Sequence, residues 1–169
     1  MRRLGLMLVA TLAGAGLVAC GKSGGGQPTG SEGAATPPAS APAAELTDAQ
    51  KQKLVADLPA PYNTADIAHG KSVFLICKSC HTTISGGANM TGPNLDGLFG
   101  RKAGSAGGFN YSDGLKASGI TWDAAQIDSW ITNPRALVPT TKMSFAGVKD
   151  PKDRADLIAY LKTEVSPAP

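Results

Sequence analysis

The spacing of apolar and polar residues predicts four helices in the part of the chain that follows residue 46. The first has Thr47 and Gln50 at the positions of a capping box, ahead of "KQKLVADL", and is expected to end at Pro59. The second repeats small or apolar residues every three and four positions, as one face of a helix does: Ile67, Gly70, Phe74 and Cys77. Gly70 lowers helix propensity by roughly 1 kcal/mol relative to Ala, which indicates close approach by another helix.

Two further helices are predicted nearer the C-terminus. The segment "TWDAAQIDSWI" has apolar residues on one side, and "NP" at 133 and 134 is expected to end it. The last helix has Asp150 as its cap, Pro151 at the first helical position and Asp153 in the first turn. Its apolar stripe consists of Leu157, Ile158, Leu161 and Val165.

Long segments between these helices show no sustained alternation of apolar and polar residues. Residues 82–120 and 133–149 are rich in Gly, Pro, Asn and Thr, so loops are expected there and strands are not. Loops of this length are uncommon in a compact domain. The pattern therefore predicts an all-α domain whose centre is filled by something other than peptide, and a flat apolar cofactor of porphyrin size has the right shape.

The first 20 residues have a different character. Arg2 and Arg3 precede an uncharged apolar run that ends in small residues, which predicts a secretory signal peptide over residues 1–19. The run is shorter than the roughly 20 helical residues that cross a bilayer. "LVAC" resembles the bacterial lipobox, so Cys20 is expected to be lipidated and to begin the mature chain. An ordinary signal peptide whose cleavage site lies beside a cysteine is the alternative.

Residues 21–46 are almost entirely Gly, Ala, Pro, Ser and Thr, with too little apolar bulk to form a core. We interpret 20–46 as a lipidated cysteine followed by a flexible linker with a span of roughly 30 Å. Either a mobile tether or a passive spacer fits this composition. The folded domain is then expected to occupy residues 47–169.

The pair of cysteines is followed directly by a histidine, and three kinds of chemistry use this arrangement. Lipidation of Cys20 leaves two of the three cysteines, Cys77 and Cys80, with His81 next in sequence. A redox dithiol normally lies in an alternation of strands and helices, which is missing. Structural zinc needs four ligands, and His69 is the only other histidine. Covalent haem attachment needs only two thiols and an adjacent imidazole, so the pattern favours haem.

Successive motifs extend beyond this pair. "GKSVFLICKSCHTT", "TGPNLDGLFGRKAG", "GFNYSDGLKASGITWD", "NPRALVPTTKMSFAG" and "DLIAYLK" resemble, in order, the motifs of class I, mitochondrial-like c-type cytochromes. The resemblance covers about residues 66–164. It implies the cytochrome c fold, in which a few helices and long loops surround one haem c.

The resemblance also implies individual roles. Cys77 and Cys80 would form the haem thioethers, and His81 and Met143 would be the axial iron ligands. The backbone carbonyl of Pro93 would accept the other ring N–H of His81. The haem propionates would be held by Arg101, Tyr111, Trp122 and Thr141. Met90 is the only other methionine downstream of Cys20 and is interpreted as an ordinary loop residue.

Four residues depart from the family's usual pattern and bear on the tuning of the iron. They are Asn89 in place of a loop-bridging histidine, Trp130 in place of a tyrosine, Leu137 in place of an aromatic residue and Thr140 in place of a glycine. These changes concern the reduction potential and the iron–sulfur bond, and they leave the family unchanged.

With both axial positions filled, the resemblance implies an electron carrier and not an enzyme. A haem peroxidase or a gas-binding sensor is the alternative if Met143 does not ligate the iron, and a docking module is a third. Expected partners are a membrane, through the lipid anchor, and redox proteins such as a quinol–cytochrome c reductase and a terminal oxidase or photosynthetic reaction centre. The expected location is the periplasmic side of a bacterial membrane.

Charge adds little to this picture. The chain has a formal net charge of +3 at pH 7, which gives no indication of nucleic-acid binding, and no small-molecule substrate is indicated. Six basic residues lie in or beside the motifs and could steer an acidic partner: Lys78, Lys102, Lys116, Arg135, Lys142 and Lys149. A solvated surface of mixed charge is the alternative interpretation.

Overall fold

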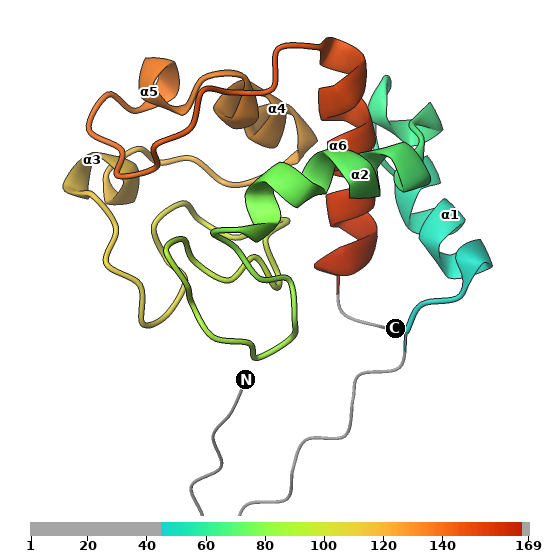
Figure 1. Ribbon diagram of the computed structural model, residues 1–169, viewed down its shortest axis with the longest axis horizontal. Coiled ribbons are helices and arrows are strands. Elements are labelled where there is room, and N and C mark those ends of the chain that lie inside the picture. The colour runs from blue at the N-terminus through green and yellow to red at the C-terminus, as the bar shows by residue number, and fades with distance from the viewer. Residues whose placement is uncertain (1–44, 167–169) are drawn as a thin grey trace, which may run out of the picture. The chain divides into compact units, whose positions relative to one another are not determined.

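The computed structural model describes residues 45–166, and these residues form a helical domain (Figure 1). Its elements are α1 (Asp48–Ala56), the 3-10 helix η1 (Tyr62–Thr64), α2 (Ile67–Lys78), α3 (Asp113–Lys116), α4 (Ala124–Thr132), α5 (Pro134–Leu137) and α6 (Pro151–Glu164). The predictions for the signal peptide, Cys20 and most of the linker lie outside the described residues.

Two of the predicted helix starts have the expected caps. In α1, the Thr47 hydroxyl accepts from the backbone N–H of Gln50 at 3.3 Å, and the Gln50 side chain accepts from the N–H of Thr47 at 2.8 Å. In α6, Asp150 accepts from the backbone N–H groups of Lys152 and Asp153. The prediction that α1 reaches Pro59 is wrong, because the chain leaves the helix after Ala56 in a tight turn.

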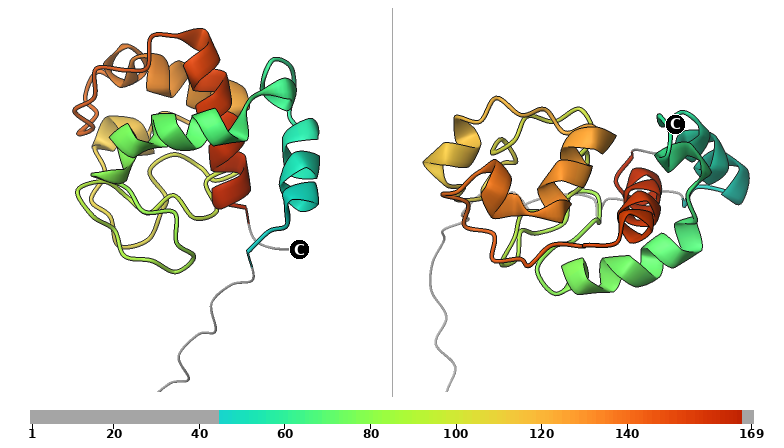
Figure 2. Two further views of the ribbon diagram at one scale, coloured as in Figure 1. Left: turned by 45° about the vertical axis from the view of Figure 1, so that its right-hand side comes forward. Right: turned by 90° about the horizontal axis from the view of Figure 1, so that it is seen from above.

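The crossing of α2 and α6 forms the centre of the domain (Figures 1 and 2). A Cβ on Gly70 would lie 1.9 Å from the carbonyl oxygen of Asp156, so only glycine permits this approach. The rings of Phe74 and Tyr160 meet beside it with centroids 5.4 Å apart. The close approach expected at Gly70 is therefore confirmed, and the predicted stripe of α6 is buried along its whole length.

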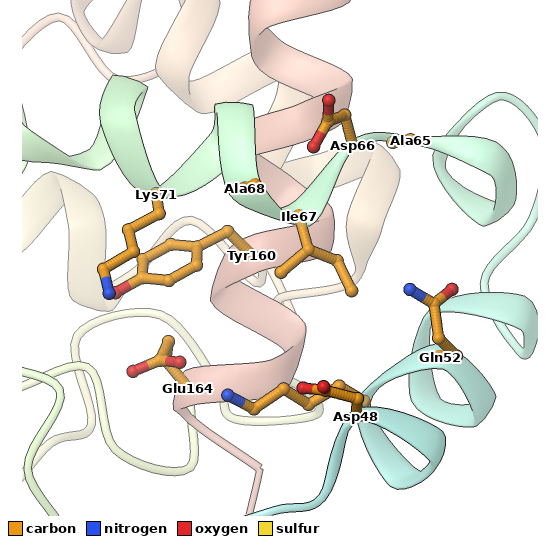
Figure 3. A pocket seen from close by; sticks show the side chains of 10 residues that line it. Asp48, Gln52, Ala65, Asp66, Ile67, Ala68, Lys71, Tyr160 and Glu164 are labelled. Atoms are coloured by element: carbon orange, nitrogen blue, oxygen red, sulfur yellow. The ribbon is translucent and has the colours of Figure 1, made fainter.

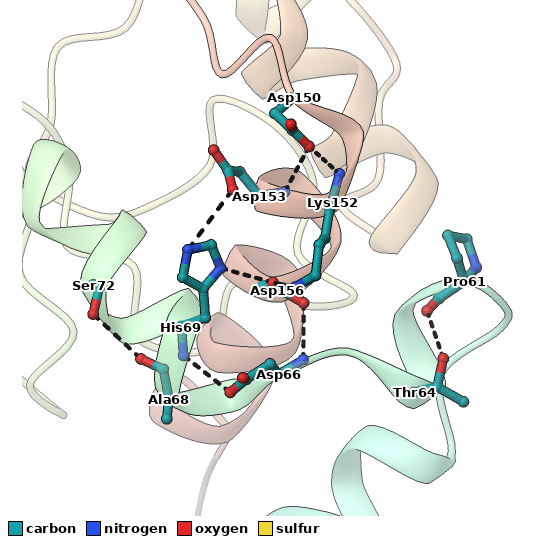
Figure 4. Close-up of polar contacts among 10 residues, drawn as sticks. All are labelled: Pro61, Thr64, Asp66, Ala68, His69, Ser72, Asp150, Lys152, Asp153 and Asp156. Carbon is teal, nitrogen blue, oxygen red and sulfur yellow. Dashed lines mark hydrogen bonds and ion pairs between the residues drawn. The ribbon is translucent and has the colours of Figure 1, made fainter.

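A buried carboxylate also joins these two helices (Figure 4). The Asp156 side chain on α6 is only 3% exposed, and one of its oxygens accepts from the backbone N–H of Asp66, the cap of α2, at 2.8 Å. Its other oxygen accepts from His69 at 2.8 Å and from Lys152 at 2.6 Å. Asp156 therefore fixes the start of α2 against α6.

Two short helices occupy segments that were predicted to be loops. Ser112 caps α3 and Asn133 caps α5, each by accepting a backbone N–H with its side-chain oxygen. The "NP" pair that was expected only to end α4 also begins α5, because Pro134 takes the first helical position. One isolated antiparallel bridge, Lys102 with Thr121, is the only extended pairing within residues 45–166.

The segment that precedes α2 packs on the rest of the domain. Val55 of α1 is 2% exposed and Tyr62 of η1 is 7% exposed, and both α1 and η1 contact α6 (Figure 2). No helix in the described part of the chain combines the length and apolar character needed to cross a bilayer.

Candidate haem site

The two cysteines and the histidine lie in one turn at the end of α2. Cys77 belongs to the last turn of the helix, and its carbonyl oxygen accepts from the backbone N–H groups of Cys80 and His81, both at 3.0 Å. Both cysteines are half-buried and form no disulfide. A single turn therefore carries two thiols and an imidazole.

The environment of these thiols disfavours the dithiol interpretation. Burial, and then the neighbouring Cys80, raise the pKa of Cys77 to about 11, whereas disulfide exchange requires a thiolate. Within residues 45–166, no group of three or more His, Cys, Asp or Glu side chains is arranged to hold a metal ion. The raised pKa of Cys77 therefore disfavours disulfide exchange at this pair.

The hydrogen bond of His81 fixes its tautomer. Nδ1 lies 2.8 Å from the carbonyl oxygen of Pro93, which can only accept, so Nδ1 carries the proton. Burial lowers the pKa of His81, although the bond to Pro93 opposes this shift. The imidazole is therefore neutral and keeps the Nε2 lone pair for a metal, which is the form that ligates iron.

The backbone of Gly92 lies directly against the same ring. A Cβ at this position would come within 2.3 Å of Cε1 of His81, and the backbone N–H of Gly92 donates to the carbonyl of Cys80 at 2.8 Å. The loop that carries Pro93 therefore packs directly on the imidazole, and its lack of a side chain at 92 makes this possible.

Two asparagines organise this loop, and only Asn89 was singled out in the sequence, as the residue in place of a loop-bridging histidine. Asn89 donates to the carbonyl of Gly107 at 3.0 Å and accepts from the backbone N–H of Asn94 at 2.9 Å, so it bridges two loops itself. The buried side chain of Asn94 donates to the carbonyls of Ile84 and Gly87. Only the content of Gly, Pro and Asn marks this region, and such content does not say which asparagine will be buried.

The residues predicted to hold propionates occupy neighbouring segments. The Arg101 guanidinium donates to the backbone carbonyls of Asp96 at 2.6 Å and Asn94 at 3.2 Å. The backbones of Arg101 and Trp122 are joined by a hydrogen bond of 2.9 Å. The guanidinium bond to Asn94 therefore anchors Arg101 to the residue that follows Pro93.

Tyr111 and Trp122 are buried among other aromatic side chains. Tyr111 packs edge-on against Phe109 with ring centroids 4.8 Å apart, and Trp122 packs edge-on against Trp130 with ring centroids 5.4 Å apart. Burial raises the pKa of Tyr111, and the charge of Arg101 partly opposes this shift. The phenol is therefore neutral at physiological pH and can donate a hydrogen bond.

The loop of Met143 is fastened by its neighbours in sequence. The Thr141 hydroxyl accepts from the backbone N–H of Met143 at 3.1 Å, and Lys142 donates to the carbonyl of Asn110 at 3.0 Å. Met143 is half-buried, whereas Met90 is 48% exposed. Within residues 45–166, His81 and Met143 share no hydrogen bond, and each is held by its own loop.

A cleft of about 440 Å³ between α1, α2 and α6 lies elsewhere (Figure 3). Its lining includes Asp48, Ile67, Lys71, Tyr160 and Glu164, and none of the residues predicted to bind haem. The candidate site is therefore defined by its donor atoms and hydrogen bonds, and not by this cleft.

These donor groups fit a covalently attached iron porphyrin. Two thiols, a neutral imidazole with Nε2 available and a thioether are the groups that attach and ligate such a cofactor. Residues 67–164, more than half of the chain, match the family described as Cytochrome c. The chain belongs to the cytochrome c family. It is therefore a haem-based electron carrier, and its cofactor is one covalent haem c.

Relatives support this assignment over most of their own length. The chain is 48% identical over 103 residues to cytochrome c2 of Rhodomicrobium vannielii, which covers 61% of this chain and 82% of the relative. It is 53% identical over 96 residues to cytochrome c2 of Rhodoplanes tepidamans, covering 57% and 90%. The solved structure of cytochrome cH from Methylobacterium extorquens matches with a TM-score of 0.55 and 48% identity, covering 59% of this chain and 99% of that one. The predicted cytochrome c fold is confirmed.

Proposed function

We propose that His81 and Met143 are the axial ligands of a haem c attached through Cys77 and Cys80, and that the protein carries single electrons between membrane-bound redox complexes. The hydrogen bond from His81 Nδ1 to Pro93, which leaves Nε2 available in the turn that also carries both cysteines, is the observation that carries this proposal. The bound haem supplies an iron that changes by one electron between its ferric and ferrous states.

The side chains around the site have separate tasks in this account. The bond to Pro93 orients the His81 ring and raises its basicity as a ligand. The thioether of Met143 is a soft donor that favours ferrous iron and raises the reduction potential relative to a second histidine. With both of these ligands in place, the iron would offer no position to a substrate, and the haem would supply electron transfer without bond formation.

The haem propionates are assigned to four side chains, each of which still has an N–H or O–H group to donate. Arg101 uses two N–H groups on backbone carbonyls and has three more to donate. The hydroxyl of Thr141 accepts from the N–H of Met143, and its own hydrogen remains to be donated. The neutral phenol of Tyr111 and the indole N–H of Trp122 complete the set. A buried carboxylate needs such donors, because an unpaired charge away from water is costly.

Replacement of the proposed distal ligand tests the account. Met143→Ala is expected to remove the weak far-red ferric absorption band that accompanies methionine–iron ligation and to lower the reduction potential, because the soft sulfur is lost. Met90→Ala is the matched control and should leave both unchanged. Survival of the band in Met143→Ala, or its loss in Met90→Ala, would contradict the assignment.

We further propose that the domain is tethered to the periplasmic side of a bacterial membrane through lipid on Cys20. The lipobox-like "LVAC" and the linker composition of residues 21–46 support this. One acyl chain gives only marginal attachment, whereas a lipidated N-terminal cysteine carries more than one. Partners would be redox complexes with acidic surfaces, such as a quinol–cytochrome c reductase and a terminal oxidase or photosynthetic reaction centre. The six basic residues proposed to steer them are all exposed.

Fractionation of cells that express the full chain tests the tether. Cys20→Ser is expected to move the haem-containing protein from the membrane to the soluble fraction, because the acyl chains are missing. Ser23→Ala, three residues further along, is the control and should remain in the membrane. An unchanged membrane fraction for Cys20→Ser would refute the anchor and leave the haem assignment untouched.

A further inference from the structure

The N-terminal segment, residues 45–66, lies before the part of the chain that the family shares. The family match begins at residue 67, and 59% of this chain is enough to cover 99% of cytochrome cH. Nevertheless, this segment forms α1 and η1 and packs on α6. It is therefore an addition to the shared fold whose contacts need an explanation.

Tyr62 makes the polar contact of this segment with α4. Its side chain is buried, and its hydroxyl donates to Oδ2 of Asp128 at 2.8 Å. Burial and the bond to Asp128 raise the pKa of Tyr62 to about 12, so the hydroxyl keeps its proton. The N-terminal segment thus provides one of the hydrogen bonds that hold the Asp128 carboxylate.

The same Asp128 carboxylate also binds a side chain of α6. Its other oxygen, Oδ1, accepts from Nε of Arg154 at 2.5 Å, and the two side chains are only 21% and 15% exposed. Nη1 of Arg154 then donates to the carbonyls of Val148 at 3.2 Å and Lys149 at 2.8 Å. These two residues form the end of the loop 138–149, which carries Met143.

The same end of the loop is pressed against α4. The backbone N–H of Val148 donates to the carbonyl of Ile131 at 2.8 Å, and Lys149 donates to the carbonyl of Thr132 at 3.0 Å. Gly147 has φ +90°, and a Cβ there would come within 2.0 Å of the Thr132 carbonyl oxygen. These contacts hold the end of the loop closely against α4, and the two hydrogen bonds from Arg154 of α6 also hold it in place.

We propose that the N-terminal segment positions the methionine loop, with Tyr62 acting through Asp128 and Arg154 to keep residues 147–149 in place. This inference rests on the proposed function, in which Met143 ligates the iron. Tyr62 is a positioning residue, because it touches none of the proposed haem ligands. Removal of its hydroxyl leaves Oδ2 of Asp128 without this donor, which frees the carboxylate and its guanidinium partner to reorient.

The test uses the full-length, haem-loaded protein and two readouts. Tyr62→Phe is expected to speed hydrogen exchange of the Val148 amide several-fold and to increase several-fold the affinity for added imidazole, which competes with Met143. Tyr160→Phe is the matched control, because Tyr160 is also a buried tyrosine but lies on α6. It should change neither the exchange at Val148 nor the imidazole affinity. In a double-mutant cycle, Tyr62→Phe should add little to the effect of Asp128→Asn on Val148 exchange and on imidazole affinity, because both substitutions act on one carboxylate.

Unchanged exchange at Val148 in Tyr62→Phe would overturn the proposal. Faster exchange with unchanged imidazole affinity would also overturn it, since the segment would then stabilise the fold without positioning the ligand. If the wild-type protein shows no far-red band, the proposed function fails instead. The exchange measurement would still report whether the segment is coupled to the loop, so the two failures are distinguishable.

Discussion

At the scale of the residue, the geometry around the proximal histidine depends on a carbonyl and on a missing side chain. Pro93 fixes the tautomer of His81, and Gly92 allows the loop to lie against the ring. The roles of the histidine and of the proline carbonyl could be anticipated from motifs. The tight packing of Gly92 could not, because sequence alone does not show which glycines face a neighbouring ring and which face solvent.

Substitution of Gly92 should therefore be far more harmful than substitution of a glycine with open space. Gly92→Ala is expected to lower the free energy of unfolding by about 1–3 kcal/mol, the usual cost of overpacking, because the new methyl group displaces the His81 ring from Pro93. Gly107→Ala is the control, since a Cβ there would meet nothing within 4 Å. Denaturant unfolding of both variants measures the difference. Equal stabilities would show that the loop can yield at Gly92.

At the scale of the element, the crossing of α2 and α6 combines an apolar contact with a buried charge. Burial would raise the pKa of Asp156, but the hydrogen bonds from Lys152, from the backbone of Asp66 and from His69 outweigh it, so the pKa is lowered below its usual value (Figure 4). A carboxylate with a lowered pKa stabilises the folded state above its unfolded-state pKa. That contribution disappears as the pH falls through the lower, folded-state value.

Asp156→Asn should remove this pH dependence. At neutral pH the variant is expected to be less stable by roughly 1.5–3 kcal/mol, because hydrogen bonds to a charged group are lost. The difference from the wild-type protein should shrink as the pH falls below about 3.8, the reference value for the unfolded chain. Asp113→Asn, at a fully exposed carboxylate, is the control. A difference that stays constant from pH 7 to below that value would contradict the account.

The helices themselves were predictable to different degrees. The longer ones carry an apolar repeat or a cap that can be read from the sequence, as Asp150 and Pro151 show for α6. The four-residue helices α3 and α5 are too short to show a repeat. Asp156 was not predicted to be buried, because carboxylates are rarely buried unless they are paired, and its partners come from two helices. The link from Tyr62 to Arg154 depends in the same way on contacts across three elements.

At the scale of the whole molecule, the chain is a cytochrome c domain preceded by additional sequence. Residues 67–164 carry the family match, and residues 45–66 are packed on them. The residues assigned to attachment, axial ligation and propionate binding all lie within the family match. In the proposals made above, electron transfer belongs to the shared part of the chain, and positioning and tethering belong to the part that precedes it.

In the proposed function, His81 and Met143 fill both axial positions of the iron, so that the protein would exchange electrons and leave no position on the iron for a substrate. Stopped-flow mixing of the ferrous, full-length protein with carbon monoxide, and in parallel with a one-electron oxidant, tests this most directly. The account predicts rapid oxidation and no spectral change with carbon monoxide at neutral pH. Binding of carbon monoxide by the wild-type ferrous protein would contradict it and would indicate a peroxidase or a gas sensor with an open iron position.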